Sequence, residues 1–232
     1  MAGKYWAIVP AAGKGSRFGD PLPKQYHPLS GKTVLEQTIA KLNDFGEFQK
    51  IAVAIAPDDQ HWETLEINTK TPVQTYVGGE ERLHSVYNAA IEIEKEMDED
   101  DWILVHDAAR PCVDLDDIRR LVVAVSGHPC GGILAAPVSD TLKRVDATQQ
   151  VSETMRRDVY WRAFTPQLFL GKLLIDALEQ RIHDYPNKVF DEAGAMELAG
   201  HRPLVVEGQA SNIKITSSSD LELAQSILEA QS

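Results

Sequence analysis

The chain has 232 residues, of which 43% are hydrophobic and 25% are charged, a composition typical of a globular protein. Its formal net charge of −12 argues against a general nucleic-acid surface and against a surface for anionic membranes, so a phosphate site would need a local cluster of cations. We expect a single domain over residues 1–232, because this length can bury one full core.

Apolar runs and helical patterns alternate along the chain. Five runs have the composition of buried strands, and they cover residues 5–10, 50–56, 72–77, 102–107 and 131–138. Between them, apolar residues at helical spacing or an acidic first turn predict helices over 33–45, 85–97 and 114–125. This alternation predicts an α/β fold of three layers with a mainly parallel, Rossmann-like sheet. Ligands of such sheets bind beyond the carboxyl ends of the strands.

Residues 139–165 interrupt this alternation. Two stretches of alternating polar and apolar residues flank "DATQQ" (146–150), which predicts a β-hairpin that projects from the domain. A long exposed hairpin makes few contacts of its own, so we expect it to be a dimerisation arm that packs on a second copy of the chain. A flexible surface excursion is the alternative interpretation.

The α/β pattern returns after this segment. Helices are predicted near 171–184 and 191–199, and strands near 203–206 and 213–216. A last helix is expected after "SSSD" (217–220).

The first predicted strand runs into a loop of small residues, "AAGKGSRFG" (11–19). Because Ala11, Ala12 and Gly13 carry little or no side chain, a ligand can approach their backbone N–H groups closely. Gly15 allows the chain to wrap around a triphosphate. These residues are typical of a loop that binds a nucleotide.

Cations in and after this loop suit phosphate groups. Arg17 offers a planar fork to phosphate oxygens, and Lys24 offers a compact charge. Small residues and cations together favour the nucleoside triphosphate loop of a nucleotidyltransferase. A glycine-rich surface turn with solvated lysines is the alternative for this loop taken alone.

A dinucleotide-binding loop fits the glycines less well. That motif needs G-x-G-x-x-G, but the spacing of Gly13, Gly15 and Gly19 is one residue too long. An acidic residue at the end of the second strand, Asp58 or Asp59, keeps this option weakly open.

The stretch "SGKT" (30–33) has the same residues as the end of a Walker P-loop motif. That motif needs a glycine five residues before "GKT", where this chain has Tyr26, and no strand precedes it. We therefore interpret "SGKT" as a turn that leads into a helix.

Further residues fall at the same edge of the predicted sheet. Gly79 follows the third strand and Ser85 lies near the start of a helix, both within "VGGEERLHSV" (77–86). Asp107 ends the strand "WILVHD" and is close to Arg110. An aspartate at this rim is a reasonable ligand for Mg²⁺, which favours one or two carboxylates together with phosphate oxygens. The alternative is that Asp107 caps a turn or pairs with Arg110.

Two cysteines, Cys112 and Cys130, are too few and too far apart for a disulfide framework or a metal knuckle. No apolar run is long enough to span a bilayer, and residues 1–10 lack the apolar region of a signal peptide. We expect a cytoplasmic protein with two reduced thiols.

The motifs as a set resemble one family. "VPAAGKGSRFG", "PKQY", "GGEERLHSV", "VHDAARPC", "PVSDTLKR", "FTPQ", "DEA" and "EGQASNIKIT" occur in the order and spacing of 2-C-methyl-D-erythritol 4-phosphate cytidylyltransferase. The resemblance covers residues from about 5 to 230. It implies an enzyme that uses CTP and Mg²⁺ to convert methylerythritol phosphate in the non-mevalonate route to isoprenoids. It also implies a homodimer built through a projecting arm.

The resemblance further implies roles for individual residues. Arg17 and Lys24 correspond to a basic pair on the CTP phosphates, and Asp107 corresponds to a metal-binding aspartate. Residues around the nucleotide are Ala11, Ala12, Gly13, Gly79, Ser85 and Ala108, to which we add Gly15 and Arg110. Methylerythritol phosphate would be held across the dimer interface by Thr141 and Arg157 of the arm, and it would be oriented by Lys214. Arg17, Lys24, Arg157 and Lys214 are thus the expected catalytic residues.

Two departures from the family pattern concern the acceptor substrate. Where many members have "TDEAS" or "TDDAS", this chain has "FDEAG", so Phe190 and Gly194 replace hydroxyl residues. Ser211 stands where some members have an acidic residue. A related cytidylyltransferase for another polyol phosphate, such as ribitol 5-phosphate, therefore stays open. A non-catalytic nucleotide-binding module is disfavoured, because a module of that kind has no need of a second phosphate site.

Overall fold

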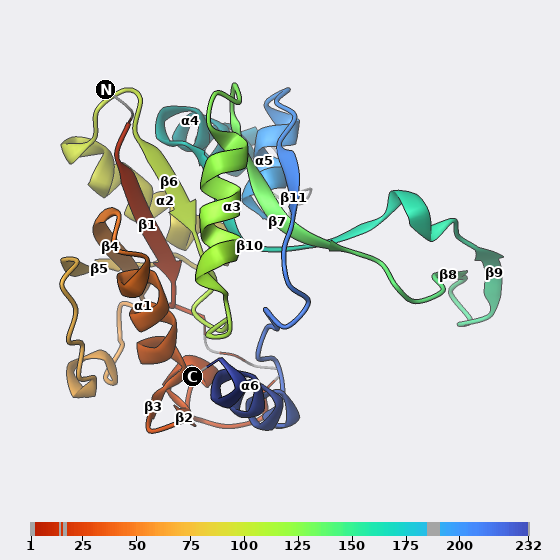
Figure 1. Ribbon diagram of the computed structural model, residues 1–232, viewed down its shortest axis with the longest axis horizontal. Helices are drawn as coiled ribbons and strands as arrows, with labels where there is room; N and C mark the ends of the chain where they lie inside the picture. The colour runs from red at the N-terminus through yellow and green to blue at the C-terminus, as the bar shows by residue number, and fades with distance from the viewer. Residues whose placement is uncertain (1–2, 14, 16–17, 185–190, 232) are drawn as a thin grey trace.

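The computed structural model describes residues 3–13, 15, 18–184 and 191–231. Within these residues, a seven-stranded sheet has the strand order β11-β7-β10-β6-β1-β4-β5 (Figure 1). Its strands are β1 (Tyr5–Pro10), β4 (Phe48–Ile55), β5 (Val73–Val77), β6 (Trp102–Val105), β7 (Gly131–Pro137), β10 (Trp161–Leu170) and β11 (Leu204–Glu207).

The sheet is mainly parallel, as predicted. β1 pairs in parallel with β4 and β6, β4 with β5, and β7 with β11. β10 is antiparallel to both of its neighbours, β6 and β7. The sequence pattern places the start of β10 in the projecting hairpin, whereas Trp161 already pairs with Pro137 of β7.

Helices cover both faces of the sheet. They are α1 (Val34–Phe45), α2 (Arg82–Ile93), α3 (Leu115–Val125), α4 (Gly171–Asp184), α5 (Glu192–Leu198) and α6 (Ser218–Ala230). Trp6 and Ile8 of β1 pack in one core with α2, α4 and α5. Ala7 and Val9 point to the other face, into a core with α1 and α3. The three-layer prediction is confirmed. No helix in the described part of the chain is both long and apolar enough to cross a membrane.

The stretch "SGKT" forms a turn and a helix cap. Ser30 and Gly31 connect β2 (Pro28–Leu29) to β3 (Lys32–Thr33), and Gly31 has a φ of 77°. Thr33 then caps α1: its Oγ1 accepts from the backbone N–H of Glu36 at 3.2 Å, and its own N–H donates to Glu36 Oε2 at 2.6 Å. The interpretation as a turn into a helix is confirmed.

This cap gives a stability prediction. Thr33→Ala removes one half of the reciprocal pair and should lower the free energy of unfolding by about 1 kcal/mol. Turnover should stay at the wild-type level, because the hydroxyl is used by the helix. Urea unfolding measures the first quantity, with Thr64→Ala as the control at an exposed threonine. A large loss of turnover in folded Thr33→Ala would contradict the capping role.

The predicted hairpin projects from the domain (Figure 1). It contains β8 (Lys143–Val145), which is antiparallel to β9 (Val151–Thr154), and the 3₁₀ helix η5 (Arg157–Val159). The tip of this arm lies far from the sheet, at the end of two extended connections that continue from β7 and into β10.

The segment between β11 and α6 runs over the carboxyl edge of the sheet without forming the strand predicted at 213–216. That prediction is wrong: Ile213 and Ile215 alternate as in a strand, but they pack in a small core with α6. Ile215 N donates to the Ala109 carbonyl at 2.9 Å, which holds the segment next to the loop after β6. Other short 3₁₀ helices are η2 (Lys24–Tyr26), η3 (Trp62–Thr64) and η4 (Glu94–Glu96).

Candidate active site

A pocket lies where the loops after β1, β5 and β6 meet the segment before α6. Ten of the residues singled out in the sequence line it: Ala11, Ala12, Gly13, Gly15, Lys24, Gly79, Ser85, Asp107, Ala108 and Lys214. Since the carboxyl ends of neighbouring parallel strands share one edge, these loops converge although they are far apart in sequence.

Gln25 holds the loop after β1 in place through two hydrogen bonds to its backbone. Its Nε2 donates to the Ala11 carbonyl at 2.7 Å and to the Gly13 carbonyl at 3.1 Å. Gln25 is buried and lines the pocket. Both contacts use carbonyl oxygens and so do not occupy the N–H groups of Ala12 and Gly13, whereas the N–H of Ala11 donates to the Ala54 carbonyl at 2.7 Å. The motif "PKQY" thus contributes a residue that shapes the loop as well as the cation Lys24.

The loop after β5 and the start of α2 form another wall of the pocket, where they lie in close contact. Gly79 N donates to Ser85 Oγ at 3.1 Å, and this hydroxyl donates to the Glu81 carbonyl at 3.2 Å. A Cβ on Gly78 would lie 2.5 Å from Ala12 Cβ, so only glycine allows the two loops to touch. The helix begins at Arg82 rather than at Ser85, which brings Arg82 to the pocket.

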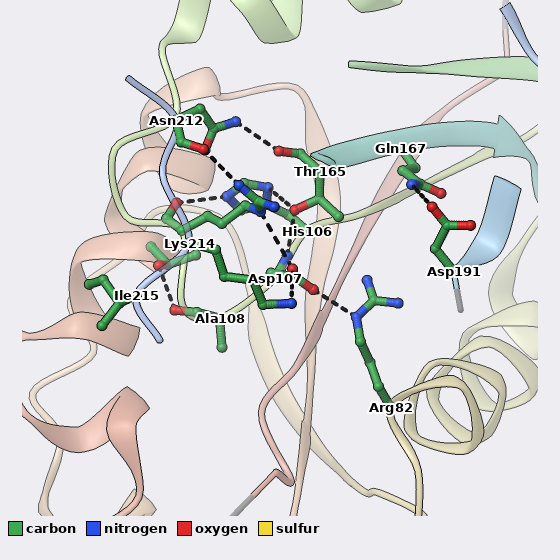
Figure 2. A network of polar contacts seen from close by, with 12 residues as sticks. Arg82, His106, Asp107, Ala108, Thr165, Gln167, Asp191, Asn212, Lys214 and Ile215 are labelled. Atoms are coloured by element: carbon green, nitrogen blue, oxygen red, sulfur yellow. Dashed lines mark hydrogen bonds and ion pairs between the residues drawn. The ribbon is translucent and has the colours of Figure 1, made fainter. Parts of the chain in front are cut away.

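Asp107 is a buried carboxylate at the centre of an array of partly buried cations (Figure 2). Arg82 Nε donates to Asp107 Oδ1 at 2.7 Å, and Lys214 Nζ lies 2.8 Å from Oδ2. Arg110 Nε is 3.5 Å from Oδ2, and the backbone N–H of Asp107 donates to Thr165 Oγ1 at 2.9 Å. Burial alone would raise the pKa of Asp107, but the charges of the three cations hold that pKa well below its usual range.

Arg110 contacts the Asp107 carboxylate and the segment before α6. Its Nη1 donates to the Asn212 carbonyl at 2.7 Å, and its guanidinium lies 5.6 Å from the ring centre of Phe164. Burial lowers the pKa of Arg110, although the charge of Asp107 opposes this. Arg110 is absent from the pocket lining in the described part of the chain, and its contacts with Asp107 and with the segment before α6 help to place Lys214.

Lys24 and Lys214 both line the pocket. Lys24 Nζ donates to the carbonyl of Ile215 at 3.1 Å, so the segment that supplies Lys214 also anchors Lys24. The third predicted cation of this region, Arg17, lies outside the described residues. Thr141 and Arg157 lie on the exposed arm, where Arg157 Nη1 donates to the carbonyl of Ser139.

His106 is buried and bonded on both ring nitrogens. Nε2 lies 2.9 Å from the Arg110 carbonyl, and Nδ1 lies 3.1 Å from Thr165 Oγ1. Burial lowers the pKa of His106 to about 4, so the ring is neutral near pH 7. This residue supports the loop that carries Asp107.

Asp59, which kept the dinucleotide option open, is used locally. Its Oδ2 accepts from the hydroxyl of Tyr26 at 2.7 Å, and its Oδ1 accepts from the backbone N–H groups of His61 and Trp62, each at 2.9 Å. These contacts belong to a turn and give no support to ribose binding.

The acidic side chains of the pocket fit a metal site with few protein ligands. Among the described residues, no group of three or more His, Cys, Asp or Glu side chains can hold a metal ion. A metal in this pocket must therefore take most of its ligands from substrate and water, as Mg²⁺ does at nucleotide phosphates. Asp107 suits this arrangement, because each of its oxygens can accept more than one contact.

Several site residues had no assigned role in the sequence. Figure 2 shows Arg82 and Thr165 in contact with Asp107, and Gln167 in contact with Asp191. Glu192, at the start of α5, accepts a hydrogen bond from Arg82. The motifs "GGEERLHSV", "FTPQ" and "DEA" contain all of them. The signal was present as motif spacing, but the spacing does not say which of these side chains meet.

Comparisons with known proteins lead to one family. The family model described as 2-C-methyl-D-erythritol 4-phosphate cytidylyltransferase (IspD) matches residues 5–230. A protein of that name from Xanthomonas euvesicatoria pv. vesicatoria (strain 85-10) is 46% identical over 221 residues, 95% of this chain and 83% of the relative. Another from Vibrio vulnificus (strain YJ016) is 42% identical over 97% of this chain and 94% of the relative. The crystal structure of the Francisella tularensis enzyme of that name aligns with a TM-score of 0.83 and 42% identity, over 97% of this chain and 99% of that chain.

Proposed function

Since the chain belongs to the 2-C-methyl-D-erythritol 4-phosphate cytidylyltransferase family, we propose that the pocket around Asp107 is its active site. The enzyme joins CTP and 2-C-methyl-D-erythritol 4-phosphate to give 4-diphosphocytidyl-2-C-methyl-D-erythritol and pyrophosphate, in the synthesis of isoprenoid precursors. One observation carries the site assignment: a loop of small residues, two lysines and a buried carboxylate meet in one pocket.

The chemistry requires charge stabilisation more than proton transfer. An oxygen of the acceptor phosphate attacks the α-phosphorus of CTP, and the bond from that phosphorus to the bridging oxygen of the β-phosphate breaks as pyrophosphate leaves. The second pKa of a phosphate monoester is about 6, so the attacking group is mostly a dianion near pH 7 and needs no general base. The neutral, fully bonded His106 is consistent with this mechanism.

The lysines of the pocket address the repulsion between two anions. We assign Lys24, together with Arg17, to the CTP phosphates, where cations stabilise the charge that grows in the transition state. Lys214 is assigned to the acceptor phosphate. Because Asp107 lies 2.8 Å from its ammonium, Lys214 is oriented before either substrate binds.

We propose Mg²⁺ as the metal, held by Asp107 and phosphate oxygens of CTP. When bound, the ion neutralises phosphate charge and favours departure of pyrophosphate. Arg82 and Lys214 keep the carboxylate of Asp107 ionised and fixed in orientation. The low pKa of Asp107 means that this ligand stays deprotonated over the whole physiological range.

The cytidine is assigned to the narrow wall made by the loops after β1 and β5. Ala12 and Gly13 offer backbone groups. Ala11 and Gly79 line the wall with their N–H groups already bonded, to the Ala54 carbonyl and to the Ser85 hydroxyl, and the second bond fixes the conformation of Gly79. A wall of small residues in contact with each other leaves room for a pyrimidine and little for a purine. Polar groups that pair with the edge of one base reject a base that leaves them unpaired.

The projecting arm supports a homodimer. It exposes a set of apolar side chains that one chain leaves uncovered: Val145, Val151, Val159, Tyr160 and Trp161. Val151 is 61% exposed and Val159 is 66% exposed, and burial of such side chains favours association. In this dimer, Thr141 and Arg157 would complete the acceptor site of the partner chain.

Hybrid dimers test this assignment. Arg157→Ala and Lys24→Ala should each be nearly inactive alone, yet an equal mixture after subunit exchange should recover about one quarter of wild-type turnover. The reason is that half of the dimers are hybrids, and each hybrid has one site with both residues intact. Mass spectrometry would verify that hybrids form. Hybrids without recovered turnover would mean that Arg157 acts within its own chain, and a fully active Arg157→Ala homodimer would mean that it has no role in turnover.

Pyrophosphate release tests the function. The enzyme is given CTP and Mg²⁺ with 2-C-methyl-D-erythritol 4-phosphate or with ribitol 5-phosphate, and a reaction without acceptor is the control. We expect rapid release with the first acceptor alone. Release with ribitol 5-phosphate alone would move the enzyme to another acceptor and give weight to "FDEAG", in which Phe190 lies outside the described residues. No release with either acceptor would favour a binding module.

A further inference from the structure

Glu192, in the first turn of α5, is a fully buried carboxylate. Its side chain is 0% exposed, and its Oε1 accepts from Arg82 Nη1 at 2.6 Å. Its Oε2 has no hydrogen-bond partner among the described residues. A buried carboxylate with so few partners opposes folding, and its side-chain partner among the described residues is Arg82.

Arg82 joins Glu192 to the active-site pocket. While Nη1 contacts Glu192, Nε donates to Asp107 Oδ1 at 2.7 Å, and the side chain lines the pocket. The guanidinium is planar and rigid, so two carboxylates that hold two of its nitrogens determine its plane and direction. Figure 2 shows Arg82 reaching from α2 toward Asp107. Asp107 therefore receives Arg82 on one oxygen and Lys214 on the other.

Two residues of strand β10 contact the regions on either side of Arg82: the loop that carries Asp107 and the first turn of α5, which carries Glu192. Thr165 accepts the backbone N–H of Asp107 at 2.9 Å. Two residues later, Gln167 Nε2 donates to Asp191 Oδ2 at 2.9 Å, and its Oε1 accepts from the N–H of Ala193 at 2.9 Å. Gln167 thus contacts both sequence neighbours of the buried glutamate, the side chain of Asp191 and the backbone of Ala193. These contacts give a common role to the motifs "FTPQ" and "DEA".

We propose that Glu192 is a positioning residue for the transfer reaction. It holds Arg82 on Oδ1 of Asp107 and so fixes the carboxylate that orients Lys214 in the pocket. Gln167 supports this arrangement by holding the first turn of α5 against β10. The inference rests on the proposed active site around Asp107.

The first test is Glu192→Gln, which keeps the size of the side chain and removes its charge. We expect kcat to fall by about 10–100-fold, the usual range for a residue that orients another functional group. Circular dichroism and thermal unfolding establish that the variant is folded. Glu197→Gln is the matched control, because Glu197 is exposed on the same helix, and its kcat should equal that of the wild type.

A double-mutant cycle separates positioning from a structural role. In the background of Arg82→Gln the path from Glu192 to Asp107 is absent, so adding Glu192→Gln should change kcat by less than about 2-fold. If Glu192→Gln does not fold, Gln167→Asn replaces it in the cycle. That variant shortens the side chain by one methylene, so its amide is withdrawn from Asp191 and Ala193 while every charge is kept. Its loss of kcat should also vanish in the background of Arg82→Gln.

Two results would overturn the inference: a wild-type kcat in folded Glu192→Gln, or an equal loss of kcat with and without Arg82. Asp107→Asn distinguishes this failure from failure of the proposed active site. An inactive Asp107→Asn with an active Glu192→Gln would remove only the positioning role of Glu192. An active Asp107→Asn would remove the site assignment itself, and the inference with it.

Discussion

Lys24→Ala is expected to lower kcat by about 10²–10³-fold, the usual effect of removing one preorganised electrostatic contact to a transition state. The Lys24 ammonium is held in the pocket by the Ile215 carbonyl at 3.1 Å, so its charge is in place before CTP binds. Negative charge grows on the phosphates during transfer, and the variant has no cation at this position to stabilise it. The free energy of unfolding should change by no more than about 1.5 kcal/mol, because the side chain is partly exposed and its hydrogen bond to the Ile215 carbonyl is only partly buried.

Pyrophosphate release at saturating CTP and acceptor measures this effect, and urea unfolding measures the stability. Lys32→Ala is the matched control, since Lys32 is an exposed lysine of β3. Its kcat should equal that of the wild type. Unchanged turnover in Lys24→Ala would remove Lys24 from the mechanism.

Asp107→Asn should damage both catalysis and folding. Asp107 is 6% exposed and is in contact with Arg82, Lys214 and Arg110. Asparagine keeps the shape but leaves these cations without their shared counter-charge, and breaking a buried ion pair in this way costs about 3–5 kcal/mol. We expect kcat to fall by at least about 10²-fold as well, because Lys214 loses its orientation and the proposed Mg²⁺ would lose its protein ligand.

Denaturant unfolding at pH 7 and pyrophosphate release measure the two effects on the same preparation. Asp116→Asn serves as the control: Asp116 is an exposed acid of α3 whose ion pair with Arg119 is on the surface. That variant should lose no more than about 1 kcal/mol and no turnover. Asp107→Asn with wild-type stability would contradict the charge array, whatever its turnover.

Much of the candidate site was predictable from sequence because loops that follow parallel strands share one edge. Ala11, Gly13, Gly79 and Asp107 each come after an apolar run, and all four line the same pocket. Lys214 could not be placed at this edge from the strand pattern. It was assigned through the family resemblance, and the strand predicted around it is absent from the described structure. The alternation of Ile213 and Ile215 is real, but it reflects packing against α6 rather than pairing in a sheet.

The partners of Asp107 were beyond the reach of sequence patterns. Arg82 and Glu192 are separated by 110 positions, and neither hydrophobic periodicity nor a turn signal relates them. Charged residues on an amphipathic helix are expected to be solvated, as Arg82 would be if α2 stood alone. Its role depends on α5 being packed beside α2 and α4 in the same core.

The amino-acid sequence by itself determined the layers and the edge where the site lies. Periodicity records which face of each element is buried: Ala7 and Val9 of β1 face one helical layer, and Trp6 and Ile8 face the other. Only the tertiary structure decided that β10 enters the sheet between β6 and β7, and that its Thr165 and Gln167 hold Asp107 and α5. The physical reason is that burial is a local property of the chain, whereas strand pairing and buried ion pairs depend on which distant segments fill the neighbouring space.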